Sequence, residues 1–140
     1  MKAVGLPPAF PHASDNLDVY IPPAQGDAAR QVLRRLGYVE LRHLEEPNKY
    51  LFKRFRAGQE VCAVHMHLRV EWSVSFLFEK QMWARRRVAP DDPALWIPGP
   101  EDALFITIAH ALYENKRIKL GDLVRANHCL ASGPLDWDYI

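Results

Sequence analysis

The chain has 140 residues, about the usual size of one domain and enough to bury a hydrophobic core. Its 18 basic and 17 acidic residues leave a formal net charge of +1, which gives no sign of a nucleic-acid or membrane surface. The start lacks a signal-peptide pattern, and the apolar runs fall well short of the roughly 20 residues of a membrane span, so we expect a soluble, cytoplasmic protein. Cys62 and Cys129 lie in apolar segments and are expected to be reduced core residues.

The first half of the chain predicts the element order βαβββ. Apolar residues at helical spacing over 26–36 predict a helix, and Gly37 suits the left-handed position just past its end. Arg30, Arg34 and Arg35 are expected on the solvent side of this helix. The strands are expected at residues 17–21, 38–43, 49–56 and 60–70.

The second half predicts three helices, with a proline-rich loop after the first. They are expected at residues 76–86, 100–115 and 119–131. The last helix is expected to bury its apolar residues Leu120, Leu123, Val124 and Leu130. Because strands come first and helices follow, the sequence predicts an α+β fold. We expect a sheet-containing core over residues 1–90 and a helical part over residues 91–140 that packs on it, forming one compact domain.

Polar side chains occupy one face of two of the predicted strands. Side chains alternate along a strand, so His65, His67 and Arg69 share one face while the residues between them are apolar. Asn16 and Asp18 are likewise two residues apart. Two carboxylates at this spacing, joined by a third from a neighbouring strand, form a cradle for divalent ions in phosphoryl transfer, and oxygen ligands of this kind suit Mg²⁺.

The segment Ser14–Ile21 resembles the catalytic strand of the DNA polymerase β-like nucleotidyltransferase superfamily. The order of the later motifs is similar to that of the uncharacterised nucleotidyltransferase family. These motifs are Leu36-Gly37-Tyr38, His65-Met66-His67-Leu68-Arg69, Met82-Trp83-Ala84-Arg85, His110-Ala111, Leu120-Gly121-Asp122-Leu123 and Leu135-Asp136-Trp137-Asp138. The similarity extends over nearly the whole chain and implies a nucleotidyltransferase-like mixed or antiparallel sheet with helices, followed by a small helical part.

The resemblance also implies an activity, which is the metal-dependent transfer of a nucleoside monophosphate from an NTP to an unknown acceptor. It assigns catalysis and metal binding to Asp18, Asn16 and His65, with Mg²⁺ as the ion. It assigns nucleotide binding to Lys2, Asp15, His67 and Arg69. Because imidazole prefers borderline metals, Zn²⁺ is the alternative ion.

Three departures from the family pattern favour a second interpretation, a catalytically inactive binding or regulatory module. The phosphate-binding loop is reduced to the fragment Lys2-Ala3-Val4-Gly5, while Asn16 and His65 stand where the family has carboxylates. Losing two of three negative charges weakens a Mg²⁺ site. A β-bulge that turned Asp15 inward would restore one of them.

Each candidate residue also has a structural explanation. Asp15-Asn16 is ordinary turn chemistry, Asp18 can simply face solvent, and a His-x-His pair is common on a half-exposed strand. His110 is expected to hydrogen-bond the backbone or a carboxylate such as Asp122. The run Arg85-Arg86-Arg87 suits a solvated helix end or contact with substrate phosphate. The tryptophans are best explained as core or helix-packing residues, namely Trp72, Trp83, Trp96 and Trp137.

Partners are indicated only in outline. The sequence contains no nucleic-acid-reading motif of a recognised type. The chain begins just before its first strand and leaves no room for the usual leading helix. A partner subunit or a missing segment is therefore expected to complete the sheet, and an exposed sheet edge favours a homodimer.

Overall fold

The computed structural model describes residues 16–41, 48–71 and 79–140. The chain divides into two compact units, and the division falls between Val70 and Glu71. The sequence analysis places a division at residue 90. The α+β fold class is confirmed, because the first unit contains a mixed four-stranded sheet and the second contains helices and a small antiparallel sheet. The packing of the two parts into one domain stays a prediction.

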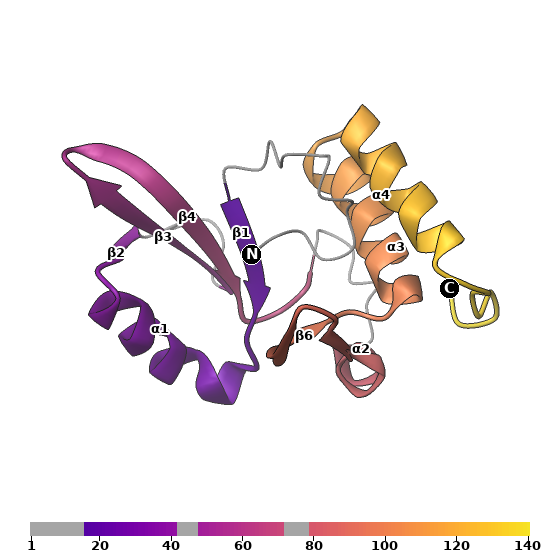
Figure 1. Cartoon of the computed structure of the whole chain (residues 1–140), viewed down its shortest axis with the longest axis horizontal. Helices are drawn as coiled ribbons and strands as arrows, with labels where there is room; N and C mark the ends of the chain where they lie inside the picture. Colours follow the sequence, from indigo (N-terminus) through magenta and orange to yellow (C-terminus); the bar gives the residue numbers. More distant parts are fainter. Residues whose placement is uncertain (1–15, 42–47, 72–78) are drawn as a thin grey trace. The chain divides into compact units, whose positions relative to one another are not determined.

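The sheet of the first unit has the strand order β1-β4-β3-β2, and Figure 1 shows these strands with one helix, α1. The bounds are β1 Asn16–Tyr20, β2 Val39–Leu41, β3 Lys49–Arg56, β4 Gln59–His67 and α1 Gly26–Arg35, with a short 3₁₀ turn at Pro23–Gln25. β1 pairs in parallel with β4, while β3 is antiparallel to both β4 and β2. The predicted order βαβββ is therefore confirmed.

The core of this unit lies on one face of the sheet. Phe52, Val64 and Met66 are almost fully buried there, and Ala29 and Leu33 of α1 pack against them. The first turn of α1 lies against the side chain of Leu68. A Cβ atom added to Gly26 would be only 2.9 Å from that side chain. The opposite face of the sheet carries His65 and His67 of β4 together with the buried Ala63.

The second unit begins with α2 (Glu79–Arg85) and contains a hairpin that the sequence analysis missed. The segment expected to be a proline-rich loop forms β5 (Arg87–Ala89) and β6 (Asp92–Ile97), which pair antiparallel. Pro93 is tolerated because it has no partner in the register, which shifts between Val88 and Ala89, so its missing N–H costs no ladder hydrogen bond. Three helical segments follow: α3 (Pro100–Ala109), a π-helical turn (His110–Glu114) and α4 (Leu120–Ala131).

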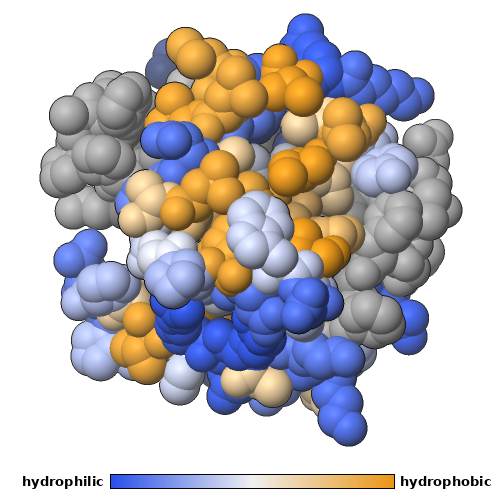
Figure 2. Space-filling view, turned by 90° about the vertical axis from the view of Figure 1, so that its right-hand side faces the viewer, coloured by the Kyte–Doolittle hydropathy of each residue, from blue (hydrophilic) through white to orange (hydrophobic). Residues whose placement is uncertain are grey.

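The expected burial of α4 is wrong for most of its apolar residues. Leu120, Leu123 and Leu130 are 77%, 56% and 48% exposed, and Val124 is half-buried. Together with apolar side chains of α3 and the turn after it, they form an exposed apolar surface, which Figure 2 shows in orange. Helical periodicity identified the apolar side of α4 but could not show whether another element covers it.

The expected roles of the arginine run and of the tryptophans also need correction. Trp83, Trp96 and Trp137 are exposed, and Trp72 lies outside the described residues. The guanidinium carbon of Arg86 lies 4.8 Å from the centre of the Trp83 ring and 4.4 Å from that of Trp96. These two exposed rings therefore form cation–π contacts with Arg86. Arg85 is not a solvated helix end, because it forms an ion pair with the buried Glu101 at 2.9 Å.

Candidate metal centre

The pairing of β1 with β4 brings the predicted site residues together. In the parallel register Asp18 is opposite His65, and Tyr20 is opposite His67. Leu17 and Val19 belong to the opposite, core face, as do Val64 and Met66 on β4. The alternation of side chains therefore places Asp18, His65 and His67 on the polar face of the same sheet.

The three side chains converge on one carboxylate oxygen. His67 Nε2 lies 3.0 Å from Asp18 Oδ1, and His65 Nδ1 lies 3.4 Å from the same atom. The two imidazole rings are nearly edge to face, with centroids 6.4 Å apart. One potential ligand atom from each side chain lies within 4.8 Å of the other two. We call this set the Asp18 cluster.

The Asp18 cluster is open to solvent on the side of the carboxylate. The Asp18 side chain is 61% exposed, while those of His65 and His67 are 20% and 25% exposed. Partial burial would raise the pKa of Asp18, but hydrogen bonds and charge interactions with the two imidazoles outweigh this effect and hold the pKa well below its usual range. At neutral pH the cluster therefore presents an ionised carboxylate that an incoming cation can reach.

A lysine that the sequence analysis missed lies beside the cluster. Lys49 on β3 is opposite His67 in the antiparallel register, and directly opposite residues share one face of a sheet. Lys53, on the same side of β3, forms an ion pair with Glu60 at 2.7 Å. Counting back from the turn at Gly58 would have placed Lys49 opposite Met66, because the register shifts by one residue between Arg54 and Phe55, so the sequence carried no signal for Lys49.

Of the other predicted site residues, Asn16 and Arg69 lie within the described part of the chain. Asn16 lies on β1 opposite Ala63, one alternation before Asp18. Arg69 is exposed and follows the end of β4, which stops at His67 rather than at residue 70. Lys2 and Asp15 lie outside the described residues, and so does the bulge suggested at Asp15. The register from Asn16 to Tyr20 is unbroken.

His110 has partners other than the one expected. Its Nε2 atom lies 3.3 Å from Glu114 Oε2, and its Nδ1 atom lies 3.0 Å from the side-chain amide of Asn115. Asp122 instead accepts a hydrogen bond from the backbone N–H of Lys119 and caps α4. His110 is therefore partnered by a carboxylate, as expected, but the carboxylate is that of Glu114 in its own helical turn and not that of Asp122.

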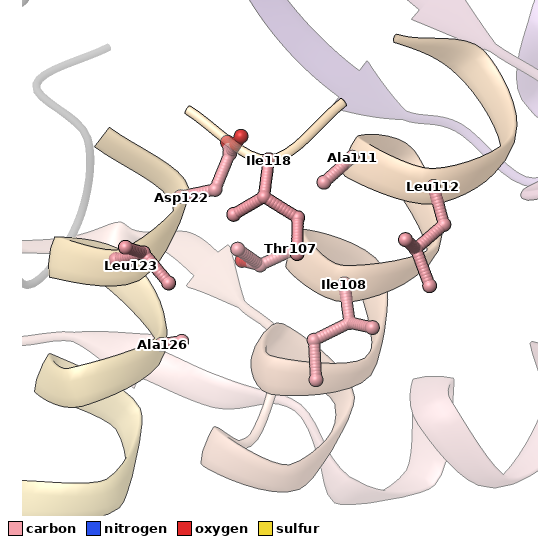
Figure 3. A pocket seen from close by; sticks show the side chains of 8 residues that line it. All are labelled: Thr107, Ile108, Ala111, Leu112, Ile118, Asp122, Leu123 and Ala126. Atoms are coloured by element: carbon pink, nitrogen blue, oxygen red, sulfur yellow. The ribbon is translucent and has the colours of Figure 1, made fainter. Parts of the chain in front are cut away.

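Within the described part of the chain, the Asp18 cluster is the one group of three or more histidine, cysteine, aspartate or glutamate side chains that could hold a metal ion. The second unit contains a small cavity of about 60 Å³ between α3, the turn after it and α4, with the lining residues labelled in Figure 3. Small-molecule pockets usually measure about 300–1,000 Å³, so this apolar cavity is too small for a nucleotide.

Comparison with known proteins gives one match. No curated protein and no solved structure matches the chain. The sequence model of the family described as "Uncharacterised nucleotidyltransferase" matches residues 8–140, which include β1, β4 and every described element of both units. The chain therefore belongs to the uncharacterised nucleotidyltransferase family.

Proposed function

We propose that the protein transfers a nucleoside monophosphate from an NTP to an acceptor hydroxyl at the polar face of its sheet. The observation that carries this proposal is the position of Asp18 in a chain of the nucleotidyltransferase family. Asp18 lies on β1, which pairs with β4, the strand that carries His65 where the family pattern has a carboxylate. In this reaction the acceptor oxygen forms a bond to the α-phosphorus. The bond from that phosphorus to the oxygen of the β-phosphate breaks, pyrophosphate leaves, and the hydroxyl proton passes to solvent.

Mg²⁺, the ion that the resemblance implies, does not fit the Asp18 cluster as a three-ligand site. Mg²⁺ takes oxygen ligands in octahedral geometry, whereas the cluster offers one carboxylate and two imidazoles. We therefore assign no step of the transfer to Mg²⁺ held by these three groups. The chain itself supplies an ionised carboxylate at Asp18 and a positive charge at Lys49 on the same face, and the latter attracts the phosphate oxygens of an NTP.

The proposed activity is tested with each of the four NTPs labelled at the α-phosphate, a divalent ion, and a nucleotide-free pool of small-molecule acceptors. Wild-type protein is expected to release pyrophosphate and to move the label into a new product. Asp18→Asn keeps the size of the side chain but removes its charge, and we expect it to lower the rate by at least about 100-fold. Asp91→Asn, at an exposed position of the second unit, is the matched control and is expected to behave as wild type.

A second function is favoured by one observation, which is that a single carboxylate is present where the family pattern has three acids. A charge-poor site of this kind would bind a nucleotide without transferring its phosphate. In that case NTPs raise the melting temperature of the protein by mass action, and no pyrophosphate is released. If no NTP moves the melting temperature and Asp18→Asn equals wild type in every assay, both functions are wrong.

A further inference from the structure

We infer that the Asp18 cluster is a binding site for a transition-metal ion of the Zn²⁺ class, with one coordination position left open toward solvent. The inference deepens the proposed function by naming the ion at the same site. It rests on that function only for the statement that the open position receives a phosphate oxygen. Metal binding itself depends on the described side chains alone.

The separations of the donor atoms suit a tetrahedral ion. Zinc bonds to imidazole nitrogen and carboxylate oxygen are about 2.0–2.2 Å long, so neighbouring ligands in a tetrahedron lie about 3.4 Å apart. The two nitrogen atoms lie 3.0 Å and 3.4 Å from Asp18 Oδ1. One donor atom from each side chain lies within 4.8 Å of the other two, so the three groups can hold one ion after rotation of their side chains.

The chemical types of the donors select the same class of ion. Two imidazoles and one carboxylate are the ligand set of several zinc enzymes that keep a fourth position for water or substrate. Imidazole is a preferred ligand of Zn²⁺ and related ions, whereas carboxylates and water suit Mg²⁺. Replacement of an acid by His65 therefore changes the expected ion as well as lowering the negative charge of the site.

The sheet holds the ligands in place before any ion binds. His65 and His67 lie two residues apart on β4, which is hydrogen-bonded to strands on both sides, and Asp18 lies on the neighbouring β1. Val64 and Met66 anchor β4 in the core, and Leu17 and Val19 of β1 pack against them. An ion held by all three side chains would cross-link β1 to β4, and its binding would stabilise the first unit.

A lysine lies on the face of the sheet where the coordination position is left open. Asp18 is the exposed member of the cluster, so the free side of a bound ion faces solvent. Lys49 lies on the same face of the sheet beside His67. A divalent cation together with a lysine is a suitable receptor for a phosphate group, which is the group that the proposed reaction must bind.

The test is a titration of the metal-free 140-residue chain with Co²⁺, which replaces Zn²⁺ and absorbs visible light far more strongly in tetrahedral than in octahedral coordination. We expect d–d bands to appear with one equivalent of Co²⁺, to vanish when Zn²⁺ is added, and to persist in an excess of Mg²⁺ of about 1,000-fold. The absence of these bands, or their loss to Mg²⁺, overturns the inference. Thiolate-to-cobalt charge-transfer bands would do so too, because they would place the ion on Cys62 or Cys129.

Single substitutions then assign the ligands. His65→Ala and His67→Ala are each expected to weaken Co²⁺ binding by at least about 100-fold, since even the loss of a residue that only supports a ligand costs 10–100-fold. His128→Ala removes an exposed histidine of α4 and is the matched control, with unchanged binding expected. Unchanged affinity in both site variants overturns the inference. If a variant fails to fold by circular dichroism, the wild-type titration and the conservative change Asp18→Asn decide the result.

The two proposals fail separately. Co²⁺ and Zn²⁺ binding without nucleotidyl transfer would overturn the proposed function and leave the metal site standing. Mg²⁺-dependent transfer by a protein that gives no Co²⁺ bands would overturn the metal site and leave the transfer standing. The titration contains no nucleotide, so its result does not depend on whether the correct acceptor has been found.

Discussion

Glu40 joins the helix of the first unit to the edge of its sheet. Its two carboxylate oxygens accept hydrogen bonds from Arg30, at 2.7 and 3.4 Å, and from Arg34, at 2.5 Å. The Glu40 side chain is only 11% exposed, and burial alone would raise its pKa. The two guanidinium groups outweigh burial, so the pKa of Glu40 lies below its usual value. These arginines, expected to face solvent without partners, therefore link α1 to β2.

Glu40→Gln is expected to lower the free energy of unfolding by about 1–3 kcal/mol at neutral pH, because two charge-assisted contacts become neutral. A carboxyl group whose pKa is lowered by folding stabilises the fold above its unfolded pKa, which is 4.5 for this residue. That stabilisation is lost as the pH falls through the folded pKa. Urea denaturation of both proteins at neutral pH and at about pH 3.5 checks this sign. A difference that grows toward low pH would contradict it.

The pKa of Asp102, in the second unit, is shifted in the opposite direction to that of Glu40. Its side chain is fully buried, one oxygen accepts a hydrogen bond from the Tyr139 hydroxyl at 2.7 Å, and the other has no hydrogen-bond partner among the described residues. Burial raises the pKa of Asp102, and together with the Asp102 hydrogen bond it also raises the pKa of Tyr139 to about 12. The ionised form of Asp102 is therefore the less favourable one in the folded protein.

Asp102→Asn keeps an acceptor for Tyr139 and cannot ionise, so we expect it to be as stable as wild type at neutral pH or more stable by up to about 1 kcal/mol. Because the pKa of Asp102 is raised, its favourable effect is present below pH 3.8 and is lost as the pH rises through the folded pKa. The variant should lack this decline, which thermal melts across the acid range can measure. An unpaired buried polar group costs about 2 kcal/mol. If Asp102→Asn is less stable than wild type by more than this amount, the explanation is wrong.

At the scale of elements, the helices of the second unit differ in how much of their apolar surface is covered. Leu104 of α3 is 4% exposed, whereas Leu120 at the start of α4 is 77% exposed. The two helices differ in composition, because α3 is apolar nearly all round whereas α4 is apolar on one side only, and the sequence predicts burial of Leu120 from that side. The difference arises because Leu104 faces packed neighbours and Leu120 does not.

This difference is measurable with two leucine substitutions. Leu104→Ala is expected to lower the free energy of unfolding by about 2–5 kcal/mol, because it leaves a cavity in packed surroundings. Leu120→Ser should change it by less than about 0.5 kcal/mol, as exposed positions usually do. Chemical denaturation of the two variants and of wild type gives both values. A large cost for Leu120→Ser would mean that α4 buries this residue, as the sequence first suggested.

At the scale of the whole molecule, the chain is a family member whose described candidate residues all belong to the first unit. None of the described helices is both long enough and apolar enough to cross a membrane. The cytoplasmic location and the homodimer or partner subunit stay predictions. The exposed apolar surface of α3 and α4 is a separate feature of the second unit, and sedimentation at increasing protein concentration would measure self-association directly.

The amino-acid sequence by itself determined the parts of this protein that depend on local order. Period-two alternation in Val61–Arg69 put both histidines on one strand face, turn residues set the hairpin after Arg56, and the order of short motifs identified the family. Such patterns are readable because side-chain direction depends only on the backbone of the same segment.

The tertiary structure alone decided what meets across long separations in the sequence. Asp18 and His67 are 49 residues apart, and only the parallel register of β1 with β4 brings their side chains to 3.0 Å. The tertiary structure also decided closer pairings, namely Arg30 and Arg34 with Glu40 and Lys49 with His67, and it left the leucines of α4 exposed. Register and burial result from the packing of all segments together, so no local pattern specifies them.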